Sequence, residues 1–245
     1  MRSDRVLYST VTLALVACGD TASPLSLEAA VVRHFGELRA IMHEGRTGPA
    51  VRVGDVVPGP HAYGLGALSE LRGEVTVIDD VVWTAYPRDD GTAEVRSDSA
   101  SDESAALFVV AKVPRWRRVV LEADIASDGL DAAIEQLAMA AGVDTTQPFP
   151  VRISGALTEL RWHVVDGSKL SPGSSHADHA RTAVSGVVPE VTGELVGFFS
   201  TQHQGVFTHR GSSTHFHVVV AAARLTGHVD GVGVRRGASV LFPER

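Results

Sequence analysis

A His-x-His pair inside an apolar strand is the sequence feature that most constrains the fold. His215 and His217 are two residues apart, so on a β-strand their imidazoles point to the same face. The β-branched and small residues 218–223 that follow are typical of a buried strand. Ten residues separate His217 from His228, which suits a neighbouring strand reached through a short turn at Thr226-Gly227. The pattern predicts a sheet in which three imidazoles share one wall.

Three neutral imidazoles with one position left open are the usual ligand set of a catalytic zinc ion. The sequence therefore predicts that His215, His217 and His228 hold Zn²⁺ on a pair of C-terminal strands. The alternative is that these are ordinary strand histidines in a chain that has eleven. The third histidine favours the metal, and a single cysteine, Cys18, excludes a cysteine metal site and a disulfide framework.

The composition is that of a globular protein with a sizeable core. The chain has 245 residues, of which 44% are hydrophobic and 21% charged, and these values exclude a disordered chain. The net charge of −7 argues against a general surface for nucleic acid or anionic lipid. No glycine-rich phosphate loop and no serine-nucleophile elbow occur in the sequence, so neither nucleotide chemistry nor serine hydrolysis is supported.

The N-terminus has the layout of a bacterial lipoprotein signal peptide. Arg2 and Arg5 precede an uncharged apolar run at 6–16 that is too short to span a bilayer, and small residues lead into Cys18. We expect residues 1–17 to be removed, Cys18 to be lipidated and residues 18–25 to form a tether. This predicts an exported protein held at a bacterial membrane by its lipid anchor alone. A buried N-terminal strand is the alternative.

The rest of the chain reads as mostly strands with few helices. Apolar residues at spacings of three and four predict a helix over 26–42, and a second helix is expected over 130–141 with Asp128 as its N-cap. Alternation on either side of Asp79-Asp80 predicts a β-hairpin over 74–86. The expected class is α/β (α+β mixed), with two lobes at 26–140 and 141–245, strand-rich mixed sheets, and the metal site in the second lobe.

Five segments in order resemble the acetolactate decarboxylase family. The resemblance covers roughly residues 30–235 and keeps the family's ten-residue gap between the second and third histidines. The matching segments are Gly64-Leu65-Gly66 through Leu71-Arg72-Gly73-Glu74, Val151-Arg152-Ile153-Ser154-Gly155, Gly193-Glu194-Leu195-Val196-Gly197-Phe198, His215-Phe216-His217, and Gly227-His228-Val229.

The resemblance implies a two-lobed protein, commonly a homodimer, with one zinc ion held by the three histidines. It also implies that Glu74 is a carboxylate near the metal, although its spacing alone favours an exposed residue at a strand end. The implied reaction is the decarboxylation of a small 2-hydroxy-3-oxo acid, 2-acetolactate, to acetoin. In it the metal acts as a Lewis acid, and a protein group protonates the product.

Two departures from the family bear on activity. The family has a catalytic arginine eleven residues after the arginine of the Arg-Ile segment, and His163 stands there in this chain. A histidine donates a proton near neutral pH but is no bidentate carboxylate clamp, and Arg161, on the same strand face, is a second candidate. The family also has a longer C-terminal segment with another acidic residue near the metal, to which Glu244 cannot be assigned.

Three functions therefore compete. The first is a lipid-anchored, zinc-dependent acetolactate decarboxylase. The second is a relative that keeps the fold and the metal but acts on another hydroxy-keto acid, or serves as a non-catalytic exported binding protein. The third is a cupin-like metal oxygenase, which would need a glutamate four or five residues after His217, where Ala221 and Ala222 stand.

Overall fold

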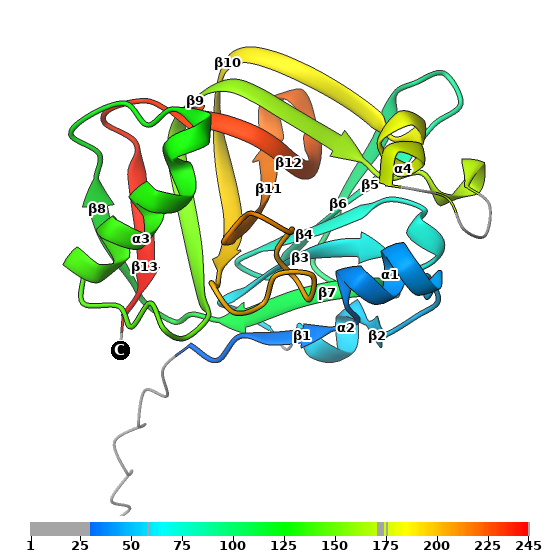
Figure 1. The fold of residues 1–245 in the computed structure, drawn as a ribbon, viewed down its shortest axis with the longest axis horizontal. Coiled ribbons are helices and arrows are strands. Elements are labelled where there is room, and N and C mark those ends of the chain that lie inside the picture. The colour runs from blue at the N-terminus through cyan, green and yellow to red at the C-terminus, as the bar shows by residue number, and fades with distance from the viewer. Residues whose placement is uncertain (1–29, 58, 171–173, 175, 245) are drawn as a thin grey trace, which may run out of the picture.

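The architecture comes from a computed structural model that describes residues 30–57, 59–170, 174 and 176–244. Two antiparallel sheets follow each other along the chain (Figure 1). The first sheet has the order β1-β7-β3-β4-β5-β6, with β2 on β7. Its strands are β1 (Arg33–Phe35), β2 (Val51–Arg52), β3 (Ala62–Leu68), β4 (Glu74–Ile78), β5 (Val81–Pro87), β6 (Ala93–Asp98) and β7 (Ser104–Lys112).

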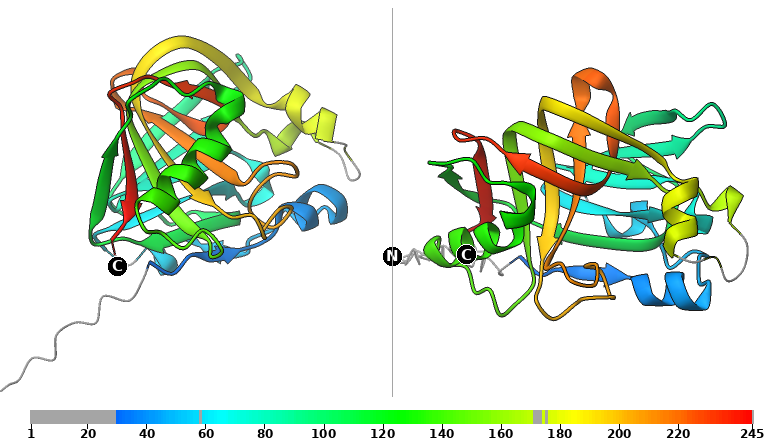
Figure 2. Two further views of the ribbon diagram at one scale, coloured as in Figure 1. Left: turned by 60° about the vertical axis from the view of Figure 1, so that its left-hand side comes forward. Right: turned by 45° about the horizontal axis from the view of Figure 1, so that its top comes forward.

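The second sheet has the order β10-β11-β12-β9-β13-β8, and β10 also pairs with β9. The pairings β9–β10, β10–β11, β11–β12 and β12–β9 thus form a closed circuit of four strands. The right-hand view of Figure 2 shows β9 and β10 running together as one long arch. The strands are β8 (Trp116–Val120), β9 (Phe149–Val164), β10 (Val184–Phe199), β11 (Thr214–Val220), β12 (Leu225–Val234) and β13 (Ser239–Pro243).

Four short helices complete the described part of the chain, and none of them is both long and apolar enough to cross a membrane. They are α1 (Leu38–Glu44), α2 (Val53–Val56), α3 (Leu130–Ala140) and α4 (His176–Thr182). The strand-rich class with few helices is confirmed, but all pairings between the named strands are antiparallel, so the sheets are not mixed. The change of sheet falls between β7 and β8, ahead of the predicted lobe boundary at 140/141.

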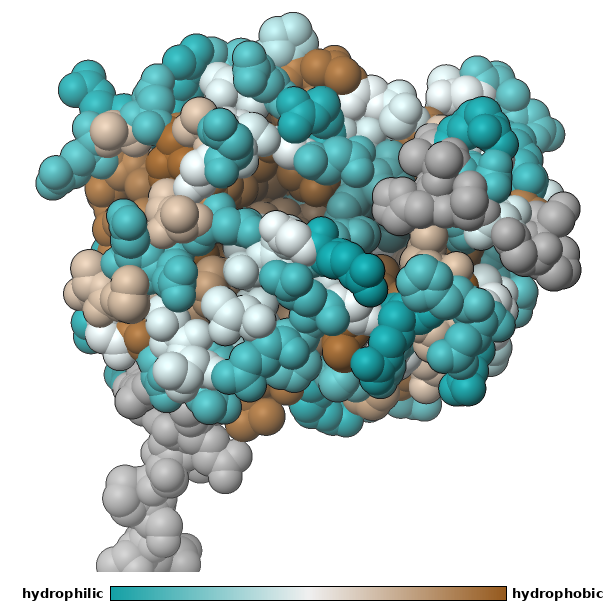
Figure 3. Space-filling model, in the orientation of Figure 1, coloured by the Kyte–Doolittle hydropathy of each residue, from teal (hydrophilic) through white to brown (hydrophobic). Residues whose placement is uncertain are grey.

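The two sheets are joined by a shared core and a polar link. Phe198 of β10 packs in one buried cluster with Leu65 and Val109 of the first sheet, and each fully buried side chain of this size contributes about 1.5–3 kcal/mol. Arg152 of β9 donates to Glu194 of β10 with Nε at 2.6 Å and to the Tyr63 hydroxyl of β3 with Nη1 at 3.2 Å. Figure 3 shows apolar residues recessed inside the second sheet beneath a largely hydrophilic rim.

The helix over 130–141 is confirmed as α3, although Gly129 rather than Asp128 is its N-cap. The hairpin over 74–86 is confirmed as β4 and β5. The helix over 26–42 is wrong in its described part, where β1 precedes α1. Gly36 lies between them at φ +73°, and a Cβ there would meet the Ala106 carbonyl oxygen at 1.9 Å. A glycine in that conformation interrupts a helix and lets β1 pair with β7.

The connection between His217 and His228 also differs from the prediction. The buried strand ends at Val220, residues Ala221–Ala223 form a 3₁₀ turn, and Arg224 adopts a left-handed conformation. Thr226 and Gly227 therefore lie inside β12 and do not form the turn. The predicted signal peptide, Cys18 and the tether at 18–25 fall outside the described residues.

Candidate metal centre

Three histidines lie in one row across three neighbouring strands. His228 of β12 stands directly opposite His217 of β11 on one side and His163 of β9 on the other. Residues directly opposite each other in an antiparallel pair project from the same face, and His215, two residues before His217, shares it. The ring centre of His228 lies 4.8 Å from that of His215, 5.7 Å from that of His217 and 4.7 Å from that of His163. The sheet therefore brings His215, His217 and His228 together.

Hydrogen bonds set the orientation of two of these rings. His215 Nδ1 lies 2.7 Å from the Phe207 carbonyl oxygen, which only accepts, so Nδ1 carries the proton and Nε2 presents a lone pair. That Nε2 lies 3.0 Å from His228 Nδ1. His217 Nδ1 lies 2.9 Å from the Thr76 hydroxyl of β4, which also accepts from Thr226 at 3.0 Å. A donating Nδ1 would leave the lone pair of His217 Nε2 directed away from Thr76.

One nitrogen of the row has no hydrogen-bond partner within the described part of the chain. His217 is 1% exposed, and its Nε2 is a buried atom without such a partner, 3.7 Å from Glu74 Oε2. A buried polar atom left unsatisfied costs about 1–3 kcal/mol, so its presence calls for a ligand. Burial, together with neighbouring histidines, lowers the pKa of His215 to about 3 and holds the pKa values of His217 and His228 well below 6.5. Neutral imidazoles and an unpartnered nitrogen fit a bound metal ion.

Glu74 faces this row from the first sheet. It is 4% exposed at the start of β4, two residues before Thr76, and accepts a hydrogen bond from the Val165 amide at 3.3 Å. Burial raises the pKa of Glu74 to about 8, against the opposing effects of His163 and the Val165 amide. A shift of this size penalises the ionised carboxylate by roughly 5 kcal/mol, so without a cation Glu74 is protonated at neutral pH. Glu74 is therefore not an exposed strand-end residue.

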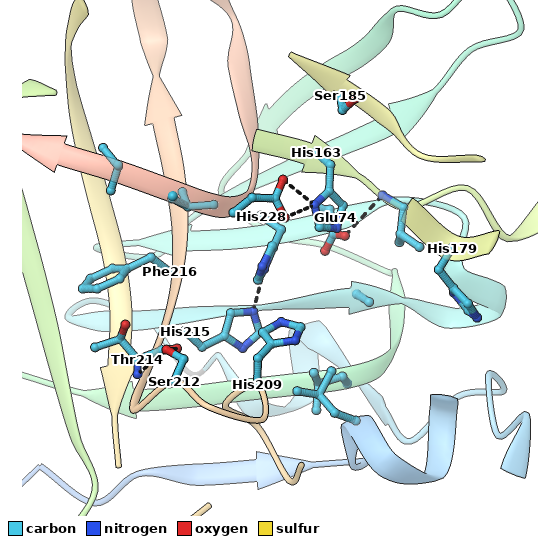
Figure 4. Close-up of a pocket in the computed structure, with 18 of the residues that line it drawn as sticks. Glu74, His163, His179, Ser185, His209, Ser212, Thr214, His215, Phe216 and His228 are labelled. Carbon is cyan, nitrogen blue, oxygen red and sulfur yellow. Dashed lines mark hydrogen bonds and ion pairs between the residues drawn. The ribbon is translucent and has the colours of Figure 1, made fainter. Parts of the chain in front are cut away.

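His163 lines the same pocket and is paired with a carboxylate. Its Nδ1 donates to Asp230, with 2.9 and 3.0 Å to the two oxygens. Burial lowers the pKa of His163, but the bond to Asp230 and the nearby charge of Glu74 outweigh burial, and the net pKa is raised above 6.5. Asp230 occupies a bulge in β12, where the register shifts between Val229 and Gly231, and a bulge re-aims a side chain. Figure 4 shows His163 beside Glu74 and His228.

The pocket that these groups line has a volume of about 600 Å³. Its polar end holds Glu74, His163, His228 and Asp230, and its other side is apolar. The apolar lining includes Leu38, Ile41 and Met42 of α1 with Leu71 and Leu107 of the first sheet. The arrangement can therefore bind a small acid by its oxygens while excluding water from the carbon skeleton.

Two of the predicted site residues, His217 and Arg161, lie outside the pocket lining, and so does Glu244, to which the sequence assigned no role. His217 is buried beside Glu74, which does line the pocket. Arg161 is exposed, and its guanidinium lies over Gly231 next to Ser127, at the rim of the pocket. Glu244 pairs with Arg115, Nε to Oε2 at 3.5 Å, away from the histidines. Sequence reasoning missed Thr76, Asp230 and His209. No local signal pointed to Asp230, because it is the residue added to β12 by a bulge, which the alternation of the sequence does not mark.

Comparison with known proteins places this geometry in a family. Residues 43–241 match the family Alpha-acetolactate decarboxylase. No curated protein sequence matches the chain. Among solved structures, the alpha-acetolactate decarboxylase of Bacillus subtilis strain 168 superimposes with a TM-score of 0.68 at 15% identity, covering 87% of this chain and 86% of that one.

Two further solved structures share the fold. Acetolactate decarboxylase of Bacillus subtilis subspecies spizizenii has a TM-score of 0.70 at 15% identity, covering 87% and 86% of the two chains. A Staphylococcus aureus protein described as of unknown function and similar to alpha-acetolactate decarboxylase has a TM-score of 0.67 at 18% identity, covering 87% and 84%. The match over residues 43–241, together with the shared fold, shows that this chain belongs to the alpha-acetolactate decarboxylase family.

Proposed function

We propose that this protein is a zinc-dependent decarboxylase that converts 2-acetolactate to acetoin, with zinc held by His215, His217 and His228. The observation that carries the proposal is the buried, unpartnered His217 Nε2, in a group of neutral imidazoles beside Glu74. Zinc bound there would act as a Lewis acid on the hydroxyl and ketone oxygens of a 2-hydroxy-3-oxo acid. The surrounding residues handle the proton and position the substrate.

Loss of the carboxyl group leaves an electron pair that enters the adjacent carbonyl, and the carbon that loses CO₂ must then gain a proton. His163 is the donor that we propose for this step. It faces the pocket, and Asp230 holds its Nδ1, so a protonated His163 presents Nε2–H as the acid. Glu74 is protonated without a cation, since burial raises its pKa to about 8. Bound zinc would favour the ionised carboxylate, which could then accept the hydroxyl proton.

Acetoin formation tests the proposal directly. Purified, zinc-loaded protein lacking residues 1–17 should release CO₂ from 2-acetolactate and form acetoin, and it should contain about one zinc ion per chain. Removing the metal with a chelator should abolish acetoin formation, and added zinc should restore it. Zinc-loaded protein that binds acetolactate but releases no CO₂ would refute the decarboxylase and leave a binding protein.

A specific observation favours a second substrate within the same reaction class. The pocket of about 600 Å³ lies in the range that accommodates much larger ligands than acetolactate, and its α1 side is apolar. We therefore also propose that longer-chain 2-hydroxy-3-oxo acids are substrates. Comparison of kcat/KM for acetolactate and for homologues with longer alkyl groups measures this, and a steady decline with chain length would rule it out.

We further propose that the protein is exported and anchored through a lipid on Cys18, on the strength of the N-terminal sequence layout alone. Fatty-acid labelling should be present in the wild type and absent in Cys18→Ser, which should persist as an uncleaved precursor. Labelling that persists in Cys18→Ser would show that the signal has been misinterpreted.

A further inference from the structure

A fourth histidine, His209, lies beside the metal-binding group and comes from a different part of the fold. It is on the segment 200–213 between β10 and β11, whereas the other three are on strands. Its ring centre lies 4.9 Å from that of His228 and 5.5 Å from that of His215. His209, His215 and His228 each offer a nitrogen within 4.8 Å of the others. Figure 4 shows the His209 ring next to that of His215 at the pocket.

The segment is fastened on both sides of His209. Before it, Phe207 is 1% exposed, and its carbonyl oxygen accepts from His215 Nδ1 at 2.7 Å. After it, Asp131 of α3 accepts from the Ser212 hydroxyl at 2.9 Å, from the Ser213 amide at 2.6 Å and from the Thr214 hydroxyl. These contacts fix the segment on both sides of His209, so the fold determines where this residue lies.

The four imidazoles form two overlapping groups of three. His215 and His228 belong to both groups, His217 completes the inner group and His209 completes the outer group. His217 lies on the inner side, where its Nε2 faces Glu74 at 3.7 Å. His209 is half-buried and lines the pocket on the outer side. His215 and His228 lie between them, close to both. A metal held by three protein ligands keeps a fourth position open, and His209 is at hand to fill it.

We propose that His209 is a fourth imidazole ligand of the metal centre, approaching from the pocket side. This rests on the proposed binding of zinc by His215, His217 and His228. The chemistry is that of a borderline cation that accepts imidazole nitrogen and forms four-coordinate sites. Because His209 is on a connecting segment while the other three are on paired strands, it is the ligand that can leave with least disturbance when a substrate oxygen needs its position.

Zinc affinity and the spectrum of cobalt test this without reference to turnover. Zinc affinity, measured by competition with a chelator, should fall about tenfold or more in His209→Gln. The visible absorption of the Co²⁺-loaded protein should change in position and intensity in the same variant. Arg210→Gln, at the exposed neighbouring position of the same segment, is the matched control and should keep the affinity and spectrum of the wild type.

A second variant separates ligation from a purely structural role. His209→Gly removes the ring, and added free imidazole should restore the wild-type cobalt spectrum only if the metal itself takes the imidazole. Wild-type affinity and spectrum in both His209 variants would overturn the inference while leaving the three-histidine site intact. A wild type that binds neither zinc nor cobalt would overturn this inference together with the proposed function.

Discussion

The two ends of the histidine row hold the same residue type with pKa values shifted in opposite directions. At the inner end, His217 is buried among Thr76, Glu74 and other imidazoles, and its pKa is held well below 6.5. At the outer end, the side chain of His163 is 26% exposed beside Asp230, and its pKa is raised. Since only one strand separates the two residues, the surroundings decide the direction of the pKa shift. A neutral imidazole suits a metal ligand, and a protonated one suits a general acid.

The largest expected effect comes from removing the inner end. His217→Ala takes away the buried nitrogen that faces Glu74, and breaking a ligand set of three should empty the site. We expect the zinc content to fall from about one per chain to near zero, with roughly a thousandfold loss of activity or more, because a Lewis-acid metal contributes several kcal/mol. Elemental analysis and acetoin formation measure both. Full zinc content in this variant would contradict the assignment.

The next effect concerns the outer end, where loss of the donor should spare the metal. His163→Ala should lower kcat by about 10²–10⁴-fold and keep its zinc, because general-acid catalysis is worth that much. His163→Arg should keep or raise the rate. In the wild type, activity should fall as pH rises through the raised pKa of His163, since the protonated form is the acid. Arg161→Ala is the control, and a larger loss there than in His163→Ala would reverse the roles.

The comparison also predicts how the metal-free protein responds to acid. His215, His217 and His228 have lowered pKa values in the folded state, so the unfolded state binds protons more readily. The free energy of unfolding is therefore highest above pH 6.5 and decreases as pH falls below it. Glu74 acts oppositely, because its raised pKa of about 8 makes the folded state gain stability as pH falls toward 4.5. The three histidines together outweigh Glu74, and we expect a net loss in the free energy of unfolding of about 2 kcal/mol between pH 6.5 and 5.5. Urea unfolding in a chelator measures it, and a flat profile would contradict it.

The smallest expected effect concerns the hydrogen bond that orients His217, at the inner end of the row. Thr76→Val keeps the shape of the side chain but removes the oxygen 2.9 Å from His217 Nδ1. Zinc affinity should weaken by about 10–100-fold, as for other partners that orient a metal-binding histidine. Thr84→Val is the matched control, because Thr84 is a buried threonine on β5 of the same sheet. It stands opposite Val75, so its side chain projects from the face opposite to that of Thr76. Equal affinities in the two variants would show that Thr76 does not orient the ring.

The parts of this site that depend on local spacing could be predicted from the sequence. The two-residue interval between His215 and His217 predicted a shared face, and the apolar run after them predicted a buried strand. The N-terminal helix was wrong because its spacing pattern gave no sign that Gly36 bends the backbone beneath Ala106. Thr76 escaped prediction because its contact with His217 joins residues 141 positions apart, which periodicity does not detect. His209 escaped it because the residue lies on a connecting segment between strands, where no periodicity applies.

The Asp230 contact depends on a different kind of information. A strand that alternates regularly gives each residue a fixed face, but a bulge adds one residue and redirects its side chain. The bulge at Asp230 turns the carboxylate toward His163. The local alternation of polar and apolar residues gives no sign that the strand contains an added residue. The raised pKa of His163 depends on this bulge, so it could not be predicted from the sequence.

The closed circuit of β9, β10, β11 and β12 has a consequence for the order of folding. His163 and Asp230 are 67 positions apart, and their strands meet only after β10 and β11 have taken their places. Such a distant closure carries a loop-entropy cost that local hairpins avoid, so it comes late. The three proposed metal ligands lie on the neighbouring strands β11 and β12, whose pairing is local, so they can come together before that closure. The pair of His163 and Asp230 forms only with the closure, so zinc binding during refolding should begin before activity does.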